Sequence, residues 1–216
     1  MRIIAFGDIH MEHQPLQSIP GLSQADLVLI TGDLTNFGNR EAAQEVLSAV
    51  KAINTKVYAQ PGNLDDASVM AYLTELGINL HGRGILFEDV GIFGVGGSNP
   101  TPFNTPTEFS EEEIAGLLNQ GYNAVSNAKV KLMVPHAPPY NTAADLISSG
   151  IHVGSKAVRE FIERMQPDFC LTGHIHEARS VDRIGKTVVL NPGMLAKGGW
   201  IELRKDAGVW SASLRP

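Results

Sequence analysis

The chain has 216 residues, of which 43% are hydrophobic and 19% are charged, and this composition excludes wholesale disorder. Its formal net charge is −6, and no run of Lys and Arg is present, which argues against extended nucleic acid as a partner. No stretch approaches the roughly 18 continuous apolar residues that cross a bilayer, so we expect a cytoplasmic protein with no membrane partner.

Short runs rich in Val, Ile and Leu predict buried β-strands at five places in the chain. They are Arg2–Phe6, Leu27–Thr31, Lys56–Ala59, Lys129–Val134 and Asp168–Thr172. Apolar residues with helical spacing lie between several of them, in residues 42–53, 114–118 and 158–165. Ser110 and Glu113 form a capping-box pattern ahead of the second of these. Alternating strands and helices predict a mostly parallel α/β sheet.

Two regions break this alternation. Residues 85–95 resemble two short paired strands, and residues 179–210 resemble three or four more, with glycine-containing turns. A second, partly antiparallel sheet is therefore expected. Residues 94–109 contain three prolines and three glycines, so we expect a surface loop there. The length of the chain favours one domain spanning residues 1–216.

A short polar motif follows each of the five predicted strands. Because the carboxyl ends of parallel strands converge on one crevice, the side chains of these motifs should meet there. The candidate metal ligands are Asp8, His10, Asp33, Asn63, His136, His174 and His176. Seven such groups exceed what one tetrahedral ion needs, and they suit two ions that share a carboxylate.

Each motif alone has an ordinary structural explanation. Gly-Asp after a strand is common turn chemistry, and a lone histidine such as His136 is more often structural than a ligand. Cys170 lies in an apolar strand and is expected to be a buried small hydrophobe; as the single cysteine it excludes an intramolecular disulfide. The joint occurrence of the motifs after five strands favours a metal site.

The order of these motifs resembles the signature of the calcineurin-like metallophosphoesterase family. That signature is Asp-x-His, Gly-Asp, Gly-Asn-His-Asp/Glu, a histidine after a strand, and Gly-His-x-His. The similarity runs from Asp8 to the Asn-Pro-Gly that ends at Gly193. It implies an α/β (α+β) fold, a two-sheet β-sandwich flanked by helices in four αββα layers.

The resemblance also implies a dinuclear phosphoesterase that uses a hydroxide between two divalent transition-metal ions. Mn, Fe, Zn, Ni and Co all suit mixed nitrogen and oxygen ligands, and Mn is favoured. It implies these metal ligands: Asp8, His10 and His176 for the first ion, Asn63, His136 and His174 for the second, and Asp33 between them. Asp65 would contribute to catalysis by orienting a ligand histidine through its ring N–H.

One position departs from the family pattern, because Leu64 stands where the motif usually has histidine. Leucine cannot protonate a leaving alkoxide, so we expect a small phosphodiester or an activated phosphoester as substrate. His152, between two glycines, is a candidate catalytic replacement, with a surface histidine as the alternative. Phe103, in the proline-rich loop, could stack on a flat group or pin the loop to the body of the protein.

Two other functions remain open from the sequence. A phosphomonoesterase or protein phosphatase would use the same metal ligands, although Leu64 argues against it. A non-catalytic metal-binding scaffold would share the fold, although every ligand position is filled here. The sequence does not indicate an oligomeric state.

Overall fold

The computed structural model describes all residues from 1 to 216. One of its two sheets has five strands in the order β11-β10-β1-β2-β3. These strands are β1 (Arg2–Phe6), β2 (Leu27–Ile30), β3 (Val57–Ala59), β10 (Trp200–Asp206) and β11 (Val209–Arg215). Strands β1, β2 and β3 run parallel, whereas β10 and β11 are antiparallel to their neighbours.

The second sheet has six strands in the order β4-β5-β6-β7-β9-β8. They are β4 (Gly84–Phe87), β5 (Val90–Val95), β6 (Val130–Pro135), β7 (Phe169–Leu171), β8 (Ser180–Ile184) and β9 (Thr187–Asn191). The four central strands are parallel, and the edge strands β4 and β8 pair with them antiparallel.

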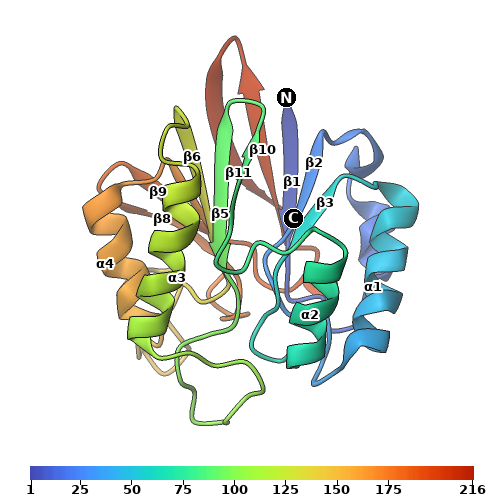
Figure 1. Cartoon of the computed structure of the whole chain (residues 1–216), viewed down its shortest axis with the longest axis horizontal. Coiled ribbons are helices and arrows are strands. Elements are labelled where there is room, and N and C mark those ends of the chain that lie inside the picture. The colour runs from blue at the N-terminus through green and yellow to red at the C-terminus, as the bar shows by residue number, and fades with distance from the viewer.

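Four α-helices cover the outer faces of the two sheets (Figure 1). Helices α1 (Arg40–Ile53) and α2 (Ala67–Glu75) flank the first sheet, and α3 (Glu111–Ala124) and α4 (Lys156–Met165) flank the second. Three short 3₁₀ helices complete the structure: η1 (Gln14–Ser18), η2 (Leu22–Gln24) and η3 (Leu195–Lys197). The expected four-layer αββα fold is confirmed. None of these helices combines the length and the apolar character that a membrane crossing would need.

Three apolar layers hold the four layers of the fold together. Strand β1 shows why its sequence is apolar throughout: Ile4 and Phe6 pack toward the helices α1 and α2, whereas Ile3 and Ala5 pack between the sheets. A third apolar cluster, which includes Phe161, lies between the second sheet and helices α3 and α4. Full burial of one such large side chain contributes about 1.5–3 kcal/mol, so these layers dominate the stability of the fold.

The strands and three of the four helices were located correctly from the sequence. The assignment of the strands to the two sheets was not. The expected second, partly antiparallel sheet is present, but the expectation that the other sheet is mostly parallel is wrong, because both sheets are mixed. Strands β1, β2 and β3 belong to one sheet, and β6 and β7 belong to the other. A strand with two buried faces has the same sequence pattern in either sheet. The five motifs therefore reach the site from two sheets.

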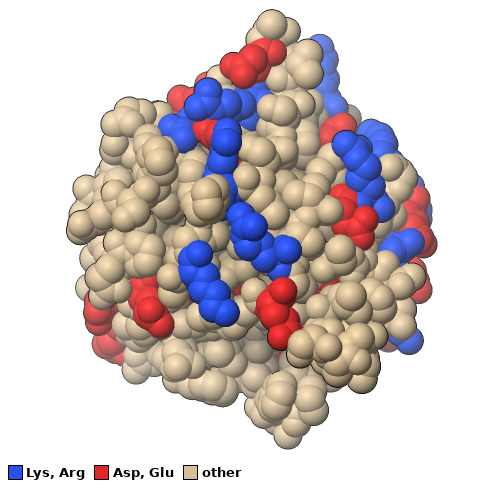
Figure 2. All heavy atoms as spheres, turned by 180° about the vertical axis from the view of Figure 1, so that it is seen from behind, with Lys and Arg blue, Asp and Glu red and all other residues tan.

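Three arginines surround one buried carboxylate on the first sheet. Glu202 Oε1 accepts from Arg2 Nε at 2.7 Å and Arg204 Nε at 2.8 Å, and Oε2 accepts from Arg215 Nη2 at 2.6 Å. Strands β10 and β11 lie behind β5 in Figure 1, and the view from behind shows a band of basic side chains (Figure 2). Burial opposes ionisation of Glu202, but its arginine partners outweigh burial and lower its pKa.

Replacing Glu202 with Gln should lower the free energy of unfolding at pH 7 by about 2 kcal/mol. The pKa of Glu202 is lower in the folded chain than in the unfolded chain. Its contribution is therefore complete above the unfolded value of about 4.3, and it disappears as the pH falls through the folded value. Urea unfolding of wild type and variant at pH 7 and pH 3 measures how the contribution of Glu202 to the free energy of unfolding changes with pH. An equal difference between wild type and variant at both pH values would contradict the ion-pair explanation.

Candidate metal centre

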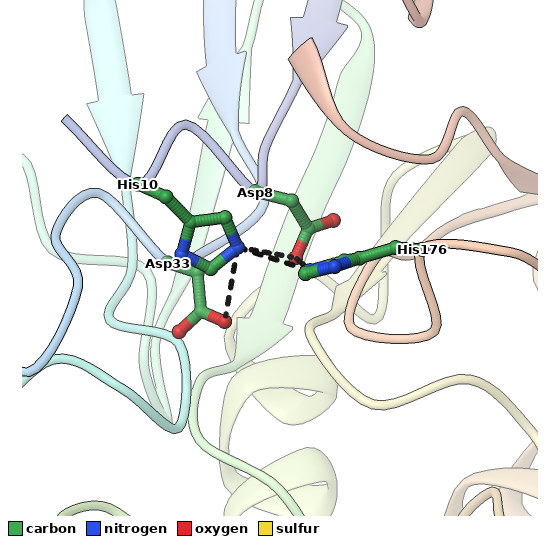
Figure 3. A group of neighbouring side chains, drawn as sticks. All are labelled: Asp8, His10, Asp33 and His176. Carbon is green, nitrogen blue, oxygen red and sulfur yellow. Dashed lines mark hydrogen bonds and ion pairs between the residues drawn. The ribbon is translucent and has the colours of Figure 1, made fainter. Parts of the chain in front are cut away.

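Four ligand-type side chains from both sheets meet at the carboxyl ends of their strands (Figure 3). They are Asp8, His10, Asp33 and His176, and one donor atom from each lies within 4.8 Å of all the others. The Nε2 atoms of His10 and His176 are 3.0 Å apart. His176 Nε2 lies 3.4 Å from Asp8 Oδ1, and His10 Nε2 lies 3.9 Å from Asp33 Oδ2. These donors point toward one common position.

A second group of donors adjoins the first through Asp33. The side-chain oxygen Oδ1 of Asn63 lies 2.8 Å from His174 Nδ1 and 3.1 Å from His136 Nε2. His136 Nε2 is also 3.4 Å from Asp33 Oδ2, the oxygen that faces His10 in the first group. The structure thus brings all seven predicted ligands together, and the Asp33 carboxylate lies between the two groups.

The backbone of the ligand loops adopts conformations that side chains usually avoid. Asp8, His10, Asp33 and His174 have φ angles of 48°, 48°, 49° and 68°, in the left-handed region. Each such residue costs free energy unless its surroundings hold it, and such residues are concentrated at functional sites. Here the His174 N–H donates to Asp8 Oδ2 at 3.1 Å, and the Leu64 N–H donates to Asp33 Oδ1 at 2.8 Å.

Glycines allow the backbone to approach the ligand carboxylates. A Cβ atom at Gly62 would collide with the side chain of Asp33, and one at Gly173 would lie 2.5 Å from Asp8 Oδ2. A Cβ atom at Gly116 in helix α3 would meet nothing within 4 Å. The glycines of the motifs therefore leave the space that the carboxylates occupy.

Replacing Gly173 with Ala is expected to weaken metal binding at least about tenfold, because the new methyl group must displace the Asp8 carboxylate. Titration of the metal-free protein with Mn²⁺, followed by calorimetry, measures the change. Gly116→Ala is the matched control and should leave metal affinity unchanged. Wild-type affinity in the Gly173→Ala variant would show that the Asp8 position does not matter for binding.

The centre is rich in buried negative charge. Asp8, Asp33 and Asp65 are at most 2% exposed, and no Lys or Arg forms an ion pair with any of them. Burial and the charge of Asp33 raise the pKa of Asp65 to about 6. Although burial favours neutral imidazole, the carboxylates of Asp33 and Asp8 raise the pKa of His136 to about 9.

Burying these carboxylates without cations is unfavourable, so the centre needs positive charge. For His174 the balance is reversed: burial and the neighbouring His136 lower its pKa to about 4, so that its imidazole is neutral and free to act as a ligand. Carboxylate, amide oxygen and imidazole together suit divalent transition-metal ions. Two groups of donors that share one carboxylate fit two such ions.

Asp65 does not have the partner that the sequence suggested. Its Oδ1 accepts from the backbone N–H and the hydroxyl of Thr35 at 2.8 and 2.7 Å. Its Oδ2 accepts from the backbone N–H groups of Leu34 and Gly62 at 3.0 and 2.8 Å. No imidazole contacts it, because these donors occupy both oxygens. Asp65 instead joins the loop that carries Asp33 to the loop that carries Asn63.

The ligand side chains are oriented by partners that the sequence did not reveal. The backbone oxygens of Thr35 and Thr31 lie 3.2 and 3.1 Å from the Nδ1 atoms of His10 and His136. Such contacts fix the ring orientation and leave Nε2 to face the centre. Backbone carbonyls carry no residue-specific signal, so only the structure could show them.

Asn63 is held by a relay from the irregular loop of residues 96–109. Its amide nitrogen donates to Thr105 Oγ1 at 3.1 Å, and this hydroxyl donates to Glu108 Oε1 at 2.6 Å. The side-chain oxygen of Asn63 is thereby directed toward His136 and His174. The loop, which extends at the lower end of the molecule in Figure 1, thus supports the centre.

His152 is the one predicted site residue that lies outside this assembly. Its Nδ1 atom is 2.7 Å from Asp145 Oδ1, and its ring lies 6.0 Å from that of Tyr140. It forms no hydrogen bond or ion pair with any of the seven ligands. Asp145 is fully buried and also accepts backbone N–H groups, including that of Gly154 at 2.9 Å. The pair braces the segment between β6 and α4.

Comparison with known proteins agrees with this geometry. The model of the calcineurin-like phosphoesterase family matches residues 1–178. An uncharacterized protein of Methanocaldococcus jannaschii is 40% identical over 197 residues, covering 89% of this chain and 88% of that protein. A probable glycerophosphodiester phosphodiesterase of Arcobacter nitrofigilis is 26% identical over 187 residues, covering 84% of this chain and 67% of that protein.

Solved structures show the same fold. A dimetal phosphatase from Danio rerio matches with a TM-score of 0.73 and 10% identity, over 100% of this chain and 96% of that one. A protein of Thermus thermophilus matches with a TM-score of 0.71 and 19% identity, over 98% and 97% of the two chains. With its four-layer fold and its cluster of metal-ligand side chains, the chain belongs to the calcineurin-like phosphoesterase family.

Proposed function

We propose that this protein hydrolyses a small phosphodiester, or an activated phosphoester, with the help of two divalent transition-metal ions. Asp8, His10 and His176 would hold one ion, Asn63, His136 and His174 the other, and Asp33 both. The observation that carries the proposal is the position of Asp33 Oδ2, 3.9 Å from His10 Nε2 and 3.4 Å from His136 Nε2. One carboxylate oxygen adjacent to both donor groups is what a shared ligand requires.

Two bound cations would lower the pKa of a water between them and neutralise the phosphate oxygens. The chain's own residues supply the arrangement. Asp65 fixes the turns of Asp33 and Asn63 through four hydrogen bonds, so these ligands keep their places without rearrangement. His152 stays a predicted proton donor, and the pH–rate profile of a His152→Ala variant is the measurement that tests it.

Preference for a diester is supported by Leu64. Leu64 is half-buried, its backbone N–H donates to the ligand Asp33, and its apolar side chain offers no proton to a poor leaving group. A relative named as a probable phosphodiesterase, 26% identical to this chain, supports the same preference. Manganese is the metal that we expect, and a cytoplasmic location stays a prediction.

The test is a panel of phosphoesters after reconstitution of the metal-free protein with each of Mn²⁺, Fe²⁺, Zn²⁺, Ni²⁺ and Co²⁺. We expect two equivalents of metal and a higher kcat/KM for bis(p-nitrophenyl) phosphate than for p-nitrophenyl phosphate. Removing the metal with a chelator should abolish turnover, and adding Mn²⁺ should restore it. Binding of two metal ions without turnover of any ester would instead indicate the non-catalytic scaffold.

A further inference from the structure

Large exposed apolar side chains are concentrated on the face that carries the metal centre. The loops that follow β2, β5 and β6 hold five of the eight in the chain: Phe37, Phe103, Tyr140, Leu146 and Ile151. The other three lie on strands β4, β8 and β11. A group of exposed apolar side chains at one functional face is typical of a binding site.

Phe37 is held beside the ligand loops in an unusual conformation. Phe37 lies two residues after Thr35, whose backbone oxygen contacts His10. Its φ angle is 53°, a left-handed conformation that is costly for a bulky residue, yet its side chain is 62% exposed. The next residue, Gly38, accepts a hydrogen bond from the Asp66 N–H at 3.2 Å. An exposed phenylalanine kept in a strained turn suggests a function in binding.

Phe103 lies in the loop that supports the ligand Asn63. Phe103 is 78% exposed and lies two residues before Thr105, which contacts the Asn63 amide. Glu108 closes this loop, because its Oε1 accepts from the hydroxyls of Thr101 and Thr105, both at 2.6 Å. The loop is therefore internally bonded, and it presents Phe103 on an ordered turn.

Leu64 lies between these two loops. The backbone oxygen of Gly38, next to Phe37, accepts the Asp66 N–H, and Thr107 of the other loop donates its backbone N–H to the backbone oxygen of Asn63 at 3.1 Å. Both loops thus border the segment from 63 to 66, which contains Leu64. The backbone N–H of Leu64 in turn donates to the ligand Asp33. The three apolar residues therefore lie in three adjoining loops, each one or two residues from a ligand or from a residue that contacts a ligand.

We propose that Phe37, Leu64 and Phe103 form a subsite for an aromatic substituent of the phosphoester. This rests on the proposed function and specifies the substrate as an ester with an aryl or nucleobase-like group. Phosphate oxygens would face the metal ligands while the flat substituent contacts the two phenylalanine rings and Leu64. Leu64, which stands where the family pattern has histidine, would then give the substituent an apolar contact at this side of the centre.

Two phosphonates that differ only in their substituent test the subsite: phenylphosphonate and methylphosphonate. Calorimetric dissociation constants are measured with the Mn²⁺-loaded protein, so the readout does not depend on turnover. Wild type should bind phenylphosphonate at least about tenfold more tightly than methylphosphonate. Phe37→Ala and Phe103→Ala should each reduce this preference about fivefold, and should leave the constant for methylphosphonate unchanged. Phe103→Leu should restore part of it.

Leu86→Ala is the matched control, since Leu86 is 66% exposed on β4. This variant should retain the full preference. Equal binding of both phosphonates by wild type, or an undiminished preference in both phenylalanine variants, would overturn the subsite. If these variants instead change the sedimentation coefficient, the phenylalanines belong to a protein interface and the subsite is also overturned. Binding of neither phosphonate would count against the proposed function itself.

Discussion

Replacing Asp33 with Asn should lower kcat/KM for bis(p-nitrophenyl) phosphate at least about 10³-fold. Asn keeps the shape of the side chain and the oxygen that accepts the Leu64 N–H, but it removes the charge beside both donor groups. Two cations held close together repel each other, and a shared carboxylate offsets that repulsion. Its loss should cost several kcal/mol of transition-state stabilisation, which corresponds to the expected decrease in rate.

Metal content separates this explanation from simple unfolding. We expect elemental analysis of Asp33→Asn to find about one metal ion per chain in place of two, with an unchanged circular-dichroism spectrum. Asp145→Asn is a useful control for metal content, because Asp145 is equally buried but contacts none of the seven ligands. Two tightly bound ions and undiminished activity in Asp33→Asn would remove Asp33 from the shared position.

Replacing Leu64 with His should raise turnover of monoesters relative to diesters at least about tenfold. A positioned proton donor contributes roughly 10²–10⁴-fold when the leaving group is poor. Position 64 is suited to this role, because its backbone N–H bond to Asp33 at 2.8 Å fixes the residue beside the centre. The effect should be larger for an alkyl phosphate than for p-nitrophenyl phosphate, whose leaving group needs little protonation.

Leu64→Met is the matched control, since methionine fills a similar volume and donates no proton. It should leave the ratio of monoester to diester turnover near the wild-type value. If Leu64→His and Leu64→Met behave alike, the missing histidine does not determine the choice between monoester and diester.

Much of the fold could be predicted from the sequence, because its strands are buried on both faces. Segments such as Arg2–Phe6 have no polar alternation, so they stand out as continuous apolar runs. The capping box of Ser110 and Glu113 correctly located the start of α3, and both of its hydrogen bonds form. Helix α2 was missed, although Asp66 caps it, since its nine residues show a weaker pattern.

The assignment of strands to sheets could not be predicted in the same way. Ile3 and Ile4 are equally buried, yet one faces the other sheet and its neighbour faces the helices. Side-chain identity does not distinguish these two surroundings.

The predicted ligands were accessible to sequence analysis because polar motifs that are each ordinary alone occur together after five buried strands. Their supports were not, because most are backbone groups. The four donors to Asp65 include three peptide N–H groups, and His10 is oriented by the carbonyl of Thr35. The pairing of His152 with Asp145 also depends on the path of one long loop. Such contacts arise only when the chain has folded.

The pairing of β1 with β10 has a consequence for synthesis on the ribosome. Ile3 lies opposite Leu203, so the strand that pairs with β1 on that side is translated about 200 residues later. Until then, one edge of β1 keeps its peptide groups unpaired, and contacts between such distant segments form slowly. The nascent chain therefore exposes an unpaired, aggregation-prone strand edge through most of its translation, and protection by a chaperone would matter most during that time.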